Sequence, residues 1–266
     1  MPFARTQSLL KKTLPEPVFD WLYRVATAGY YARQKVADWW YYRQSSVIVN
    51  AIKIVRPYTM VGRGGLVATF NVAQQVCKDN IAGCFVECGV ARGGCSLLMQ
   101  LASLSTTGRT RVEWLFDSFE GLPEPTTEDG VLRKPQGKDR RSWDLVKGYC
   151  LGTLEEVEDL LFNEFGFSRD KVHLVKGWFQ DTLPQYKEQV GNIAVLRIDG
   201  DWYESTKCCL ANLYEQVVDG GYVIIDDYAL VGCRKAVDEF FAGKEYPDMV
   251  LDGRGGGWFR KKEAVK

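Results

Sequence analysis

The sequence predicts an α/β protein built on a mostly parallel sheet with helices on both faces. Short runs rich in Val, Ile and Leu, such as 194–198 and 221–225, are separated by stretches with the periodicity of helices. Continuous apolar runs of this length are typical of parallel strands that are buried on both faces. Another run, 84–88, leads through a glycine turn into a helical stretch, as in nucleotide-binding βα units.

Strand and helix patterns alternate along most of the chain after residue 57. We therefore expect one domain, 57–266, with a doubly wound seven-stranded sheet. The segment 62–65 is expected to be a flexible, glycine-rich connection. The predicted strands are 84–88, 112–117, 171–177, 194–198, 221–225, 249–252 and 256–260, and the predicted helices include 66–80, 95–103, 154–165 and 231–241.

Residues 1–56 have helical periodicity and many aromatic side chains, which predicts a helical N-terminal extension. Charged residues such as Arg33 and Asp38 interrupt its apolar windows, so no segment is long enough to span a membrane. The extension is predicted to cover the sheet or to form a subunit interface, with a lid or a membrane-surface contact as alternatives. The polar segment 124–142 is predicted to be a functional lid, with a disordered loop as the alternative.

Composition argues against several classes of protein. Basic and acidic residues number 34 each, which leaves no basic surplus for binding nucleic acid. The eight cysteines form no Cys-x-x-Cys pair and no signal-peptide pattern is present. These features predict a reducing, cytoplasmic compartment in which the cysteines are buried apolar side chains. The single histidine, His173, excludes a His-rich zinc site and argues against a Ser-His-Asp triad.

Two of the predicted strands end abruptly on carboxylates. Asp199 and Asp201 follow the run 194–198, and Asp226 and Asp227 follow the run 221–225. Ligands of open α/β sheets bind beyond the carboxyl ends of the strands, so this edge is the candidate site. Several acids gathered there need a compensating cation or proton. The alternative is that these acids cap the following helix or bind loop amides.

The glycine turn after the run 84–88 favours a cofactor without phosphates. Ala91 stands where a dinucleotide-binding turn has the glycine that lets the backbone approach a pyrophosphate. This difference weakens the case for NAD or FAD and suits S-adenosylmethionine. Glu87, just before the turn, is placed to hold the cationic end of that cofactor or bound water. Asp117, at the end of the next strand, is placed to accept its ribose hydroxyls.

Five motifs together resemble the macrocin O-methyltransferase family of the TylF/MycF type, over about residues 58–240. They are FVECGVARGG at 85–94, FDSFEGLP at 116–123, VKGWFQDTLP at 175–184, LRIDGDWYEST at 196–206 and GYVIIDDY at 221–228. The resemblance implies a class I, Rossmann-like methyltransferase that uses S-adenosylmethionine and Mg²⁺ to methylate a sugar hydroxyl of a natural product. It also implies a homo-oligomer, which the aromatic side chains of the extension favour.

The resemblance also assigns site residues. Asp199 would be a metal ligand and, because it adjoins both metal and acceptor, the general base. All three implied metal ligands are carboxylates, which favours Mg²⁺, Mn²⁺ or Ca²⁺ over softer ions. The cofactor-binding residues are expected to be Thr59, Met60, Glu87, Gly89, Ala91, Asp117, Ser118, Gly177 and Trp178, and the metal ligands Asp199, Asp226 and Asp227.

Three alternative functions remain at this stage. The same chemistry could act on a catechol, or on a peptide or lipid hydroxyl. An NAD-dependent oxidoreductase could use the same sheet, although Ala91 argues against it. A non-catalytic binding protein is the third alternative, although every acid that the reaction needs is present.

Overall fold

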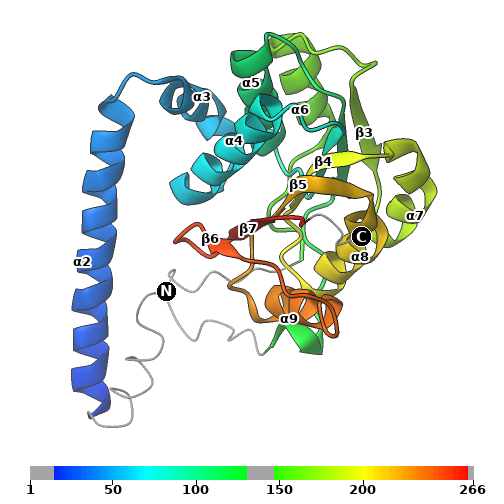
Figure 1. Ribbon diagram of the computed structural model, residues 1–266. Coiled ribbons are helices and arrows are strands. Elements are labelled where there is room, and N and C mark those ends of the chain that lie inside the picture. The colour runs from blue at the N-terminus through cyan, green and yellow to red at the C-terminus, as the bar shows by residue number, and fades with distance from the viewer. Residues whose placement is uncertain (1–14, 131–146, 263–266) are drawn as a thin grey trace.

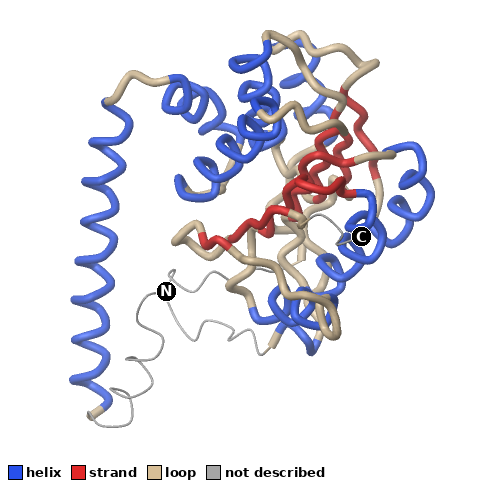
Figure 2. Tube along the Cα trace, in the orientation of Figure 1, coloured by secondary structure: helices blue, strands red, loops and turns tan. Residues whose placement is uncertain are grey.

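The computed structural model describes residues 15–130 and 147–262, and its centre is a seven-stranded sheet (Figure 1, Figure 2). The strand order is β3-β2-β1-β4-β5-β7-β6. Strands β1 to β5 are parallel, β7 is antiparallel to β5, and β6 is antiparallel to β7. The predicted α/β fold is confirmed. The strands are β1 Cys84–Cys88, β2 Glu113–Asp117, β3 Val172–Lys176, β4 Ile193–Ile198, β5 Val217–Ile225, β6 Val250–Leu251 and β7 Gly257–Arg260.

Helices cover both faces of the sheet and enclose two hydrophobic cores. Successive strand residues point to opposite faces, and β1 shows the division. Phe85 packs with α3, α4, α5 and η3, while Val86 packs with α7, α8 and α9. The helices over the sheet are α3 Val47–Val55, α4 Arg63–Lys78, α5 Gly94–Thr107, α6 Leu154–Glu158, α7 Phe179–Val190, α8 Tyr203–Leu213 and α9 Val231–Phe240, with the short η1 Arg56–Tyr58, η2 Thr127–Asp129, η3 Asp159–Glu164 and η4 Tyr214–Gln216.

The glycine-rich segment 62–65 is not the flexible connection that the sequence predicts. Helix α4 begins at Arg63, so Gly64 and Gly65 lie in its first turn. A Cβ atom at Gly64 would come within 2.6 Å of the Asp252 carbonyl oxygen, and one at Gly65 within 2.7 Å of the Val61 side chain. These glycines therefore allow close packing of the helix start, which composition alone does not distinguish from flexibility.

Two further elements differ from the sequence-based expectation. The pattern does not predict helix α7, because Pro184 lies inside it and lacks the amide hydrogen that a helix interior uses. The helix forms with Leu183 and Val190 buried in one of the cores. The predicted helix 154–165 is present but becomes π-helical from Asp159.

Of the predicted lid, 131–142 lies outside the described residues, so the lid stays a prediction.

The N-terminal extension forms the long helix α2, Glu16–Arg43, which stands apart from the sheet along most of its length (Figure 1). It is attached near its end through Asp38. That carboxylate is 3.0 Å from Arg63 Nε on α4 and 3.5 Å from Arg254 Nη2 in the β6–β7 turn. No helix in the described ranges is long and apolar enough to cross a bilayer.

Candidate active site at the carboxyl edge of the sheet

Acidic side chains from four adjacent strands meet at one edge of the sheet, beside a cavity of about 1010 Å³. Glu87 belongs to β1 and Asp117 to β2, Asp199 follows β4, and Asp226 follows β5. The cavity lies where the strand order reverses, between β1 and β4. Open α/β sheets bind ligands at this reversal, so the fold itself indicates the site.

The turn after β1 is held tightly against the end of β4. Gly89 has φ 92°, and a Cβ atom there would lie 1.8 Å from the carbonyl oxygen of Asp199. No other residue fits this position without moving one of the two strand ends. Ala91 also has a positive φ, 46°, which is uncommon for a residue with a side chain. The glycine turn thus joins the predicted cofactor residues directly to the predicted metal ligands.

Asp117 organises the same turn. Its Oδ2 accepts hydrogen bonds from the amides of Val90 and Ala91, at 2.7 and 3.0 Å, and its Oδ1 accepts one from the amide of Phe119 at 2.7 Å. Burial raises the pKa of Asp117, although these three amides act to lower it. A carboxylate has about four lone-pair sites, so about one remains for a ligand in the cavity.

Arg197 lies under the acidic cluster and is fully buried. Its Nη1 donates to Glu87 Oε1 at 3.0 Å and to Asp199 Oδ2 at 2.6 Å, and its Nη2 donates to Asp226 Oδ1 at 2.5 Å. Ser96 Oγ also donates to Glu87. Burial raises the pKa of Glu87 to about 7 even though Arg197 opposes the shift. One guanidinium thus serves three carboxylates.

The three predicted metal ligands converge in the structure. Asp199, Asp226 and Asp227 each offer one carboxylate oxygen, and these oxygens lie within 4.8 Å of one another. Burial, followed by the charge of Asp199, raises the pKa of Asp226 to about 7. Burial and the charges of Asp201, Asp199 and Asp226 raise the pKa of Asp227 well above its usual range. Such a cluster gains stability from a bound cation or proton.

Asp201 is a further member of the cluster that is not among the predicted site residues. It lines the cavity, has φ 56°, and its amide donates to Asp227 Oδ2 at 3.3 Å. Burial and the charges of Asp199 and Asp226 raise its pKa to about 8. The sequence signal that could have assigned Asp201 to the site is its position just after a predicted strand, two residues from Asp199.

The other predicted residues lie on or beside the cavity. Thr59 and Met60 line the cavity from the N-terminal side. The chain before them crosses over the start of α5 at Gly94, where an added Cβ atom would lie 2.6 Å from the Tyr58 carbonyl oxygen. The absence of a side chain at Gly94 therefore allows this crossing. Gly177 is the one predicted site residue that is not among those lining the cavity, and its amide donates to the Asp117 carbonyl at 2.9 Å. The predicted residues that line the cavity are Thr59, Met60, Glu87, Gly89, Ala91, Asp117, Ser118, Trp178, Asp199, Asp226 and Asp227.

Sequence reasoning missed Arg197 and the outer wall of the cavity. Arg197 is a charged residue inside an otherwise apolar strand, and that contrast was the available signal. Tyr149, Cys150 and Trp202 form part of the wall. Trp202 stands inside the motif at 196–206, whereas no sequence pattern distinguishes Tyr149 and Cys150. His173 is not among the lining residues and packs on Trp114 with ring centroids 4.3 Å apart.

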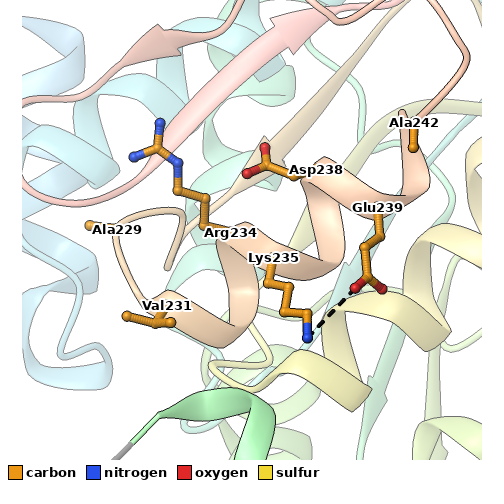
Figure 3. Close-up of a pocket in the computed structure, with 7 residues that line it drawn as sticks. All are labelled: Ala229, Val231, Arg234, Lys235, Asp238, Glu239 and Ala242. Atoms are coloured by element: carbon orange, nitrogen blue, oxygen red, sulfur yellow. Dashed lines mark ion pairs between the residues drawn. The ribbon is translucent and has the colours of Figure 1, made fainter.

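A second hollow, of about 520 Å³, lies along the outer side of α9 (Figure 3). It shares no lining residue with the larger cavity. Lys235 and Glu239 point toward each other in it and form an ion pair at 3.7 Å. Lys235 is thus neutralised by Glu239 and no strand ends converge on the hollow, so it does not have the features of an active site. Its lining residues are Ala229, Val231, Arg234, Lys235, Asp238, Glu239 and Ala242.

Comparison with known proteins identifies the family. Residues 33–261 match the macrocin-O-methyltransferase (TylF) family. The chain belongs to this family. It is therefore an S-adenosylmethionine-dependent O-methyltransferase, which confirms the resemblance and decides against the NAD-dependent oxidoreductase.

The alignments to individual relatives cover about three quarters of this chain. It is 36% identical over 203 residues to the 8-demethyl-8-(2,3-dimethoxy-alpha-L-rhamnosyl)-tetracenomycin-C 4'-O-methyltransferase of Streptomyces olivaceus, covering 76% of this chain and 75% of that one. It is 36% identical over 208 residues to the demethyldecarbamoylnovobiocin O-methyltransferase of Streptomyces niveus, covering 77% and 76%. The solved structure of the O-methyltransferase NovP superposes with a TM-score of 0.62 at 34% identity, covering 77% of this chain and 83% of that one.

Proposed function

We propose that this enzyme transfers a methyl group from S-adenosylmethionine to a sugar hydroxyl of a glycosylated natural product, with Mg²⁺ held by Asp199, Asp226 and Asp227. The supporting observation is that these three carboxylates share one cavity with the glycine turn at Gly89. The names of the relatives, among them a methyltransferase of a rhamnosyl tetracenomycin, support the class of acceptor.

The residues around the turn fit S-adenosylmethionine. Gly89 provides a bare backbone surface, Asp117 retains a lone-pair site for a ribose hydroxyl, and Trp178 offers a flat apolar face for an adenine. Glu87 already accepts hydrogen bonds from Arg197 and Ser96. It would therefore act on the cofactor through its negative charge beneath the binding site. When bound, the cofactor supplies an electrophilic methyl group on its sulfonium.

The acidic cluster fits a hard divalent cation. Arg197 occupies one oxygen of Asp199 and one of Asp226, which leaves each of them a second oxygen. Asp227 contributes a third carboxylate. An all-oxygen set of this kind suits Mg²⁺. Bound there, the ion would supply a Lewis acid that lowers the pKa of an acceptor hydroxyl.

Asp199 is the proposed general base. Its backbone carbonyl faces Gly89 and its side chain faces Asp226 and Asp227, so it stands between the cofactor turn and the other ligands. Arg197 fixes one oxygen of this carboxylate at 2.6 Å and thereby orients the other. A base must be held within hydrogen-bond reach of the proton it removes, and this ion pair provides the orientation.

The outer wall of the cavity is rich in aromatic side chains. Tyr149, Trp178 and Trp202 line it, and Trp202 is held by a 3.0 Å hydrogen bond from its Nε1 to the carbonyl of Pro123. Flat rings of this kind pack against the apolar faces of sugars and of aromatic aglycones. The acceptor test below also includes catechol, peptide and lipid hydroxyls, which are the alternatives that the sequence leaves open.

The test is methyl transfer to a panel of acceptors that contains glycosides, free sugars, catechols, and peptide and lipid alcohols. We expect turnover with a glycoside, loss of turnover in EDTA, and recovery when Mg²⁺ is added back. Calorimetry should show Mg²⁺ binding that Asp226→Asn with Asp227→Asn abolishes, while the exposed Asp170→Asn keeps it. Activity that survives complete chelation would overturn the metal part of the proposal.

Two further properties belong to the proposal. We place the enzyme in the cytoplasm, because all eight cysteines lie in the described ranges as free thiols and six of them are buried. We also propose that it is a homo-oligomer, because its extension exposes several large apolar side chains.

A further inference from the structure

One wall of the large cavity is formed by residues 121–126, which follow β2 and are called the acceptor wall below. The segment has no regular secondary structure, so its position depends on contacts with other elements. The carboxylates of the proposed metal site line the same cavity. The members of the acceptor wall that line the cavity are Gly121, Leu122, Pro123, Glu124 and Thr126.

Asp129, a buried residue of η2, holds the end of the acceptor wall. Its Oδ2 accepts hydrogen bonds from the amide and the hydroxyl of Thr126, at 2.7 and 3.0 Å. Its Oδ1 accepts one from the amide of Tyr203 at 2.7 Å. This one carboxylate therefore joins the acceptor wall to the start of α8, which lies 74 residues further along the chain.

Helix α8 has no cap from its own N-cap residue, which is Trp202. The amides of a first helical turn need acceptors, and the helix dipole favours a negative charge there. Asp129 supplies that acceptor from another part of the chain. Since Tyr203 directly follows the turn that begins at Asp199, Asp129 is bonded to the end of the turn that carries the proposed base.

The start of α9 is shaped to admit Asp129. A Cβ atom at Gly232, in the first turn of α9, would lie 1.9 Å from Asp129 Oδ1. The N-cap residue of α9, Leu230, likewise makes no side-chain cap. The Asp129 carboxylate thus lies against the starts of two helices, and η2 packs against α9 as the green segment beneath it in Figure 1.

Trp202 provides a second connection between the acceptor wall and the same turn. Its ring is buried, and its Nε1 donates to the carbonyl of Pro123 at 3.0 Å. Pro123 lies in the middle of the acceptor wall and Thr126 at its end. Two neighbouring residues, Trp202 and Tyr203, therefore fix the position of the whole segment relative to Asp199.

We propose that Asp129 is a positioning residue that sets the orientation of the methyl acceptor. It keeps the acceptor wall in a fixed position relative to the turn that begins at Asp199, and the acceptor lies between the two. Orientation decides which hydroxyl faces the methyl donor, so Asp129 controls selectivity without touching the acceptor. The proposal rests on the proposed function, in which this side of the cavity takes the acceptor.

The test compares Asp129→Ala with the wild type, using the acceptor class that turns over in the panel described above. We expect the acceptor KM to rise by roughly tenfold, as for loss of one hydrogen bond to a charged group. Methylation should spread to a neighbouring hydroxyl, which NMR of the products detects, while the affinity for S-adenosylhomocysteine stays unchanged. Asp129→Asn can still accept from Tyr203 but not also from Thr126, so its effect should be intermediate. Glu128→Gln is the matched control, because this neighbouring carboxylate pairs with Lys235 at the surface.

Gly232→Ala displaces the carboxylate without removing it. We expect the same rise in acceptor KM and the same second product, because the added Cβ atom would take the place of Asp129 Oδ1. Alanine also favours the helix intrinsically, so loss of α9 would not account for such a change. Both substitutions disrupt one contact, and their effects in the double variant should therefore be less than additive.

Hydrogen exchange tests the connection without any acceptor. The amides of Thr126 and Tyr203 should exchange faster in Asp129→Ala, whereas those of Val90 and Ala91, which another carboxylate holds, should not change. Unchanged exchange at Thr126 and Tyr203 would overturn the proposal. So would a variant that is less stable in urea yet keeps the acceptor KM and the single product, because its role would then be structural only. Failure of the proposed function appears elsewhere, as a wild-type enzyme that does not methylate glycosides.

Discussion

Arg197 Nη1 lies 2.6 Å from Asp199 Oδ2, in an ion pair whose basic member is fully buried. The same guanidinium reaches Glu87 and Asp226, so removing it leaves three carboxylates without a counter-charge. Breaking a buried ion pair from one side typically costs about 3–5 kcal/mol. The carboxylates of the proposed metal site are therefore held by a permanent cation that belongs to the protein.

We predict that Arg197→Met lowers the free energy of unfolding by about 3–5 kcal/mol, measured by urea denaturation. Mg²⁺ should recover more stability in this variant than in the wild type, because the ion offsets charge on Asp199 and Asp226. Arg169→Met is the control, since Arg169 is largely exposed and its partner Glu158 is partly exposed. An unchanged midpoint for Arg197→Met would show that the carboxylates are protonated or otherwise compensated.

Asp199→Asn should retain the fold and the binding of S-adenosylhomocysteine but lose turnover by roughly 100-fold or more, because the general base is gone. Calorimetry measures the binding and a methyl-transfer assay the rate. Asp170→Asn serves as the matched control at an exposed aspartate. A rate close to that of the wild type would place the base at another residue.

Gly89→Ala should abolish cofactor binding, because the new Cβ would lie 1.8 Å from the Asp199 carbonyl and would push the two strand ends apart. Gly108→Ala is the control. Gly108 also has a positive φ, 69°, but a Cβ there would meet nothing within 4 Å. Both variants carry the backbone strain of about 1–2 kcal/mol, so the difference between them measures the contact. Equal affinities for S-adenosylhomocysteine would contradict the tight fit.

Glu113→Gln should stabilise the protein at neutral pH. Burial raises the pKa of Glu113 well above its usual range, against the hydrogen bond that Gln100 donates at 3.0 Å. The folded state therefore keeps a proton that the unfolded chain releases above its ordinary pKa of about 4.3. Stability contributed by this carboxyl is present below that value and is lost as pH rises toward the folded pKa.

The measurement for Glu113 is urea unfolding of both proteins at about pH 5 and about pH 8. The advantage of Glu113→Gln over the wild type should be larger at the higher pH, because glutamine does not titrate. A difference that is the same at both values would mean that Glu113 keeps an ordinary pKa in the folded protein.

The sheet could be predicted because strands buried on both faces must be almost continuously apolar, as the runs 84–88 and 194–198 are. The convergence of Asp199, Asp226 and Asp227 could be predicted because strand-end acids of one parallel sheet share an edge. Arg197 lies only two residues before its partner Asp199, but its contact with Glu87 joins residues 110 apart in sequence, and only the folded sheet shows that one guanidinium serves both. Helix α7 was hidden by Pro184, whose local penalty is outweighed by burial of its neighbours.

The contact between Gly89 and the Asp199 carbonyl couples the proposed cofactor turn to the proposed metal ligands, because neither strand end can shift without the other. A descendant of this enzyme cannot reposition one without disturbing the other. We therefore expect a change of acceptor to come from cavity side chains away from this contact, such as Tyr149, which can be replaced while the proposed reaction geometry is kept.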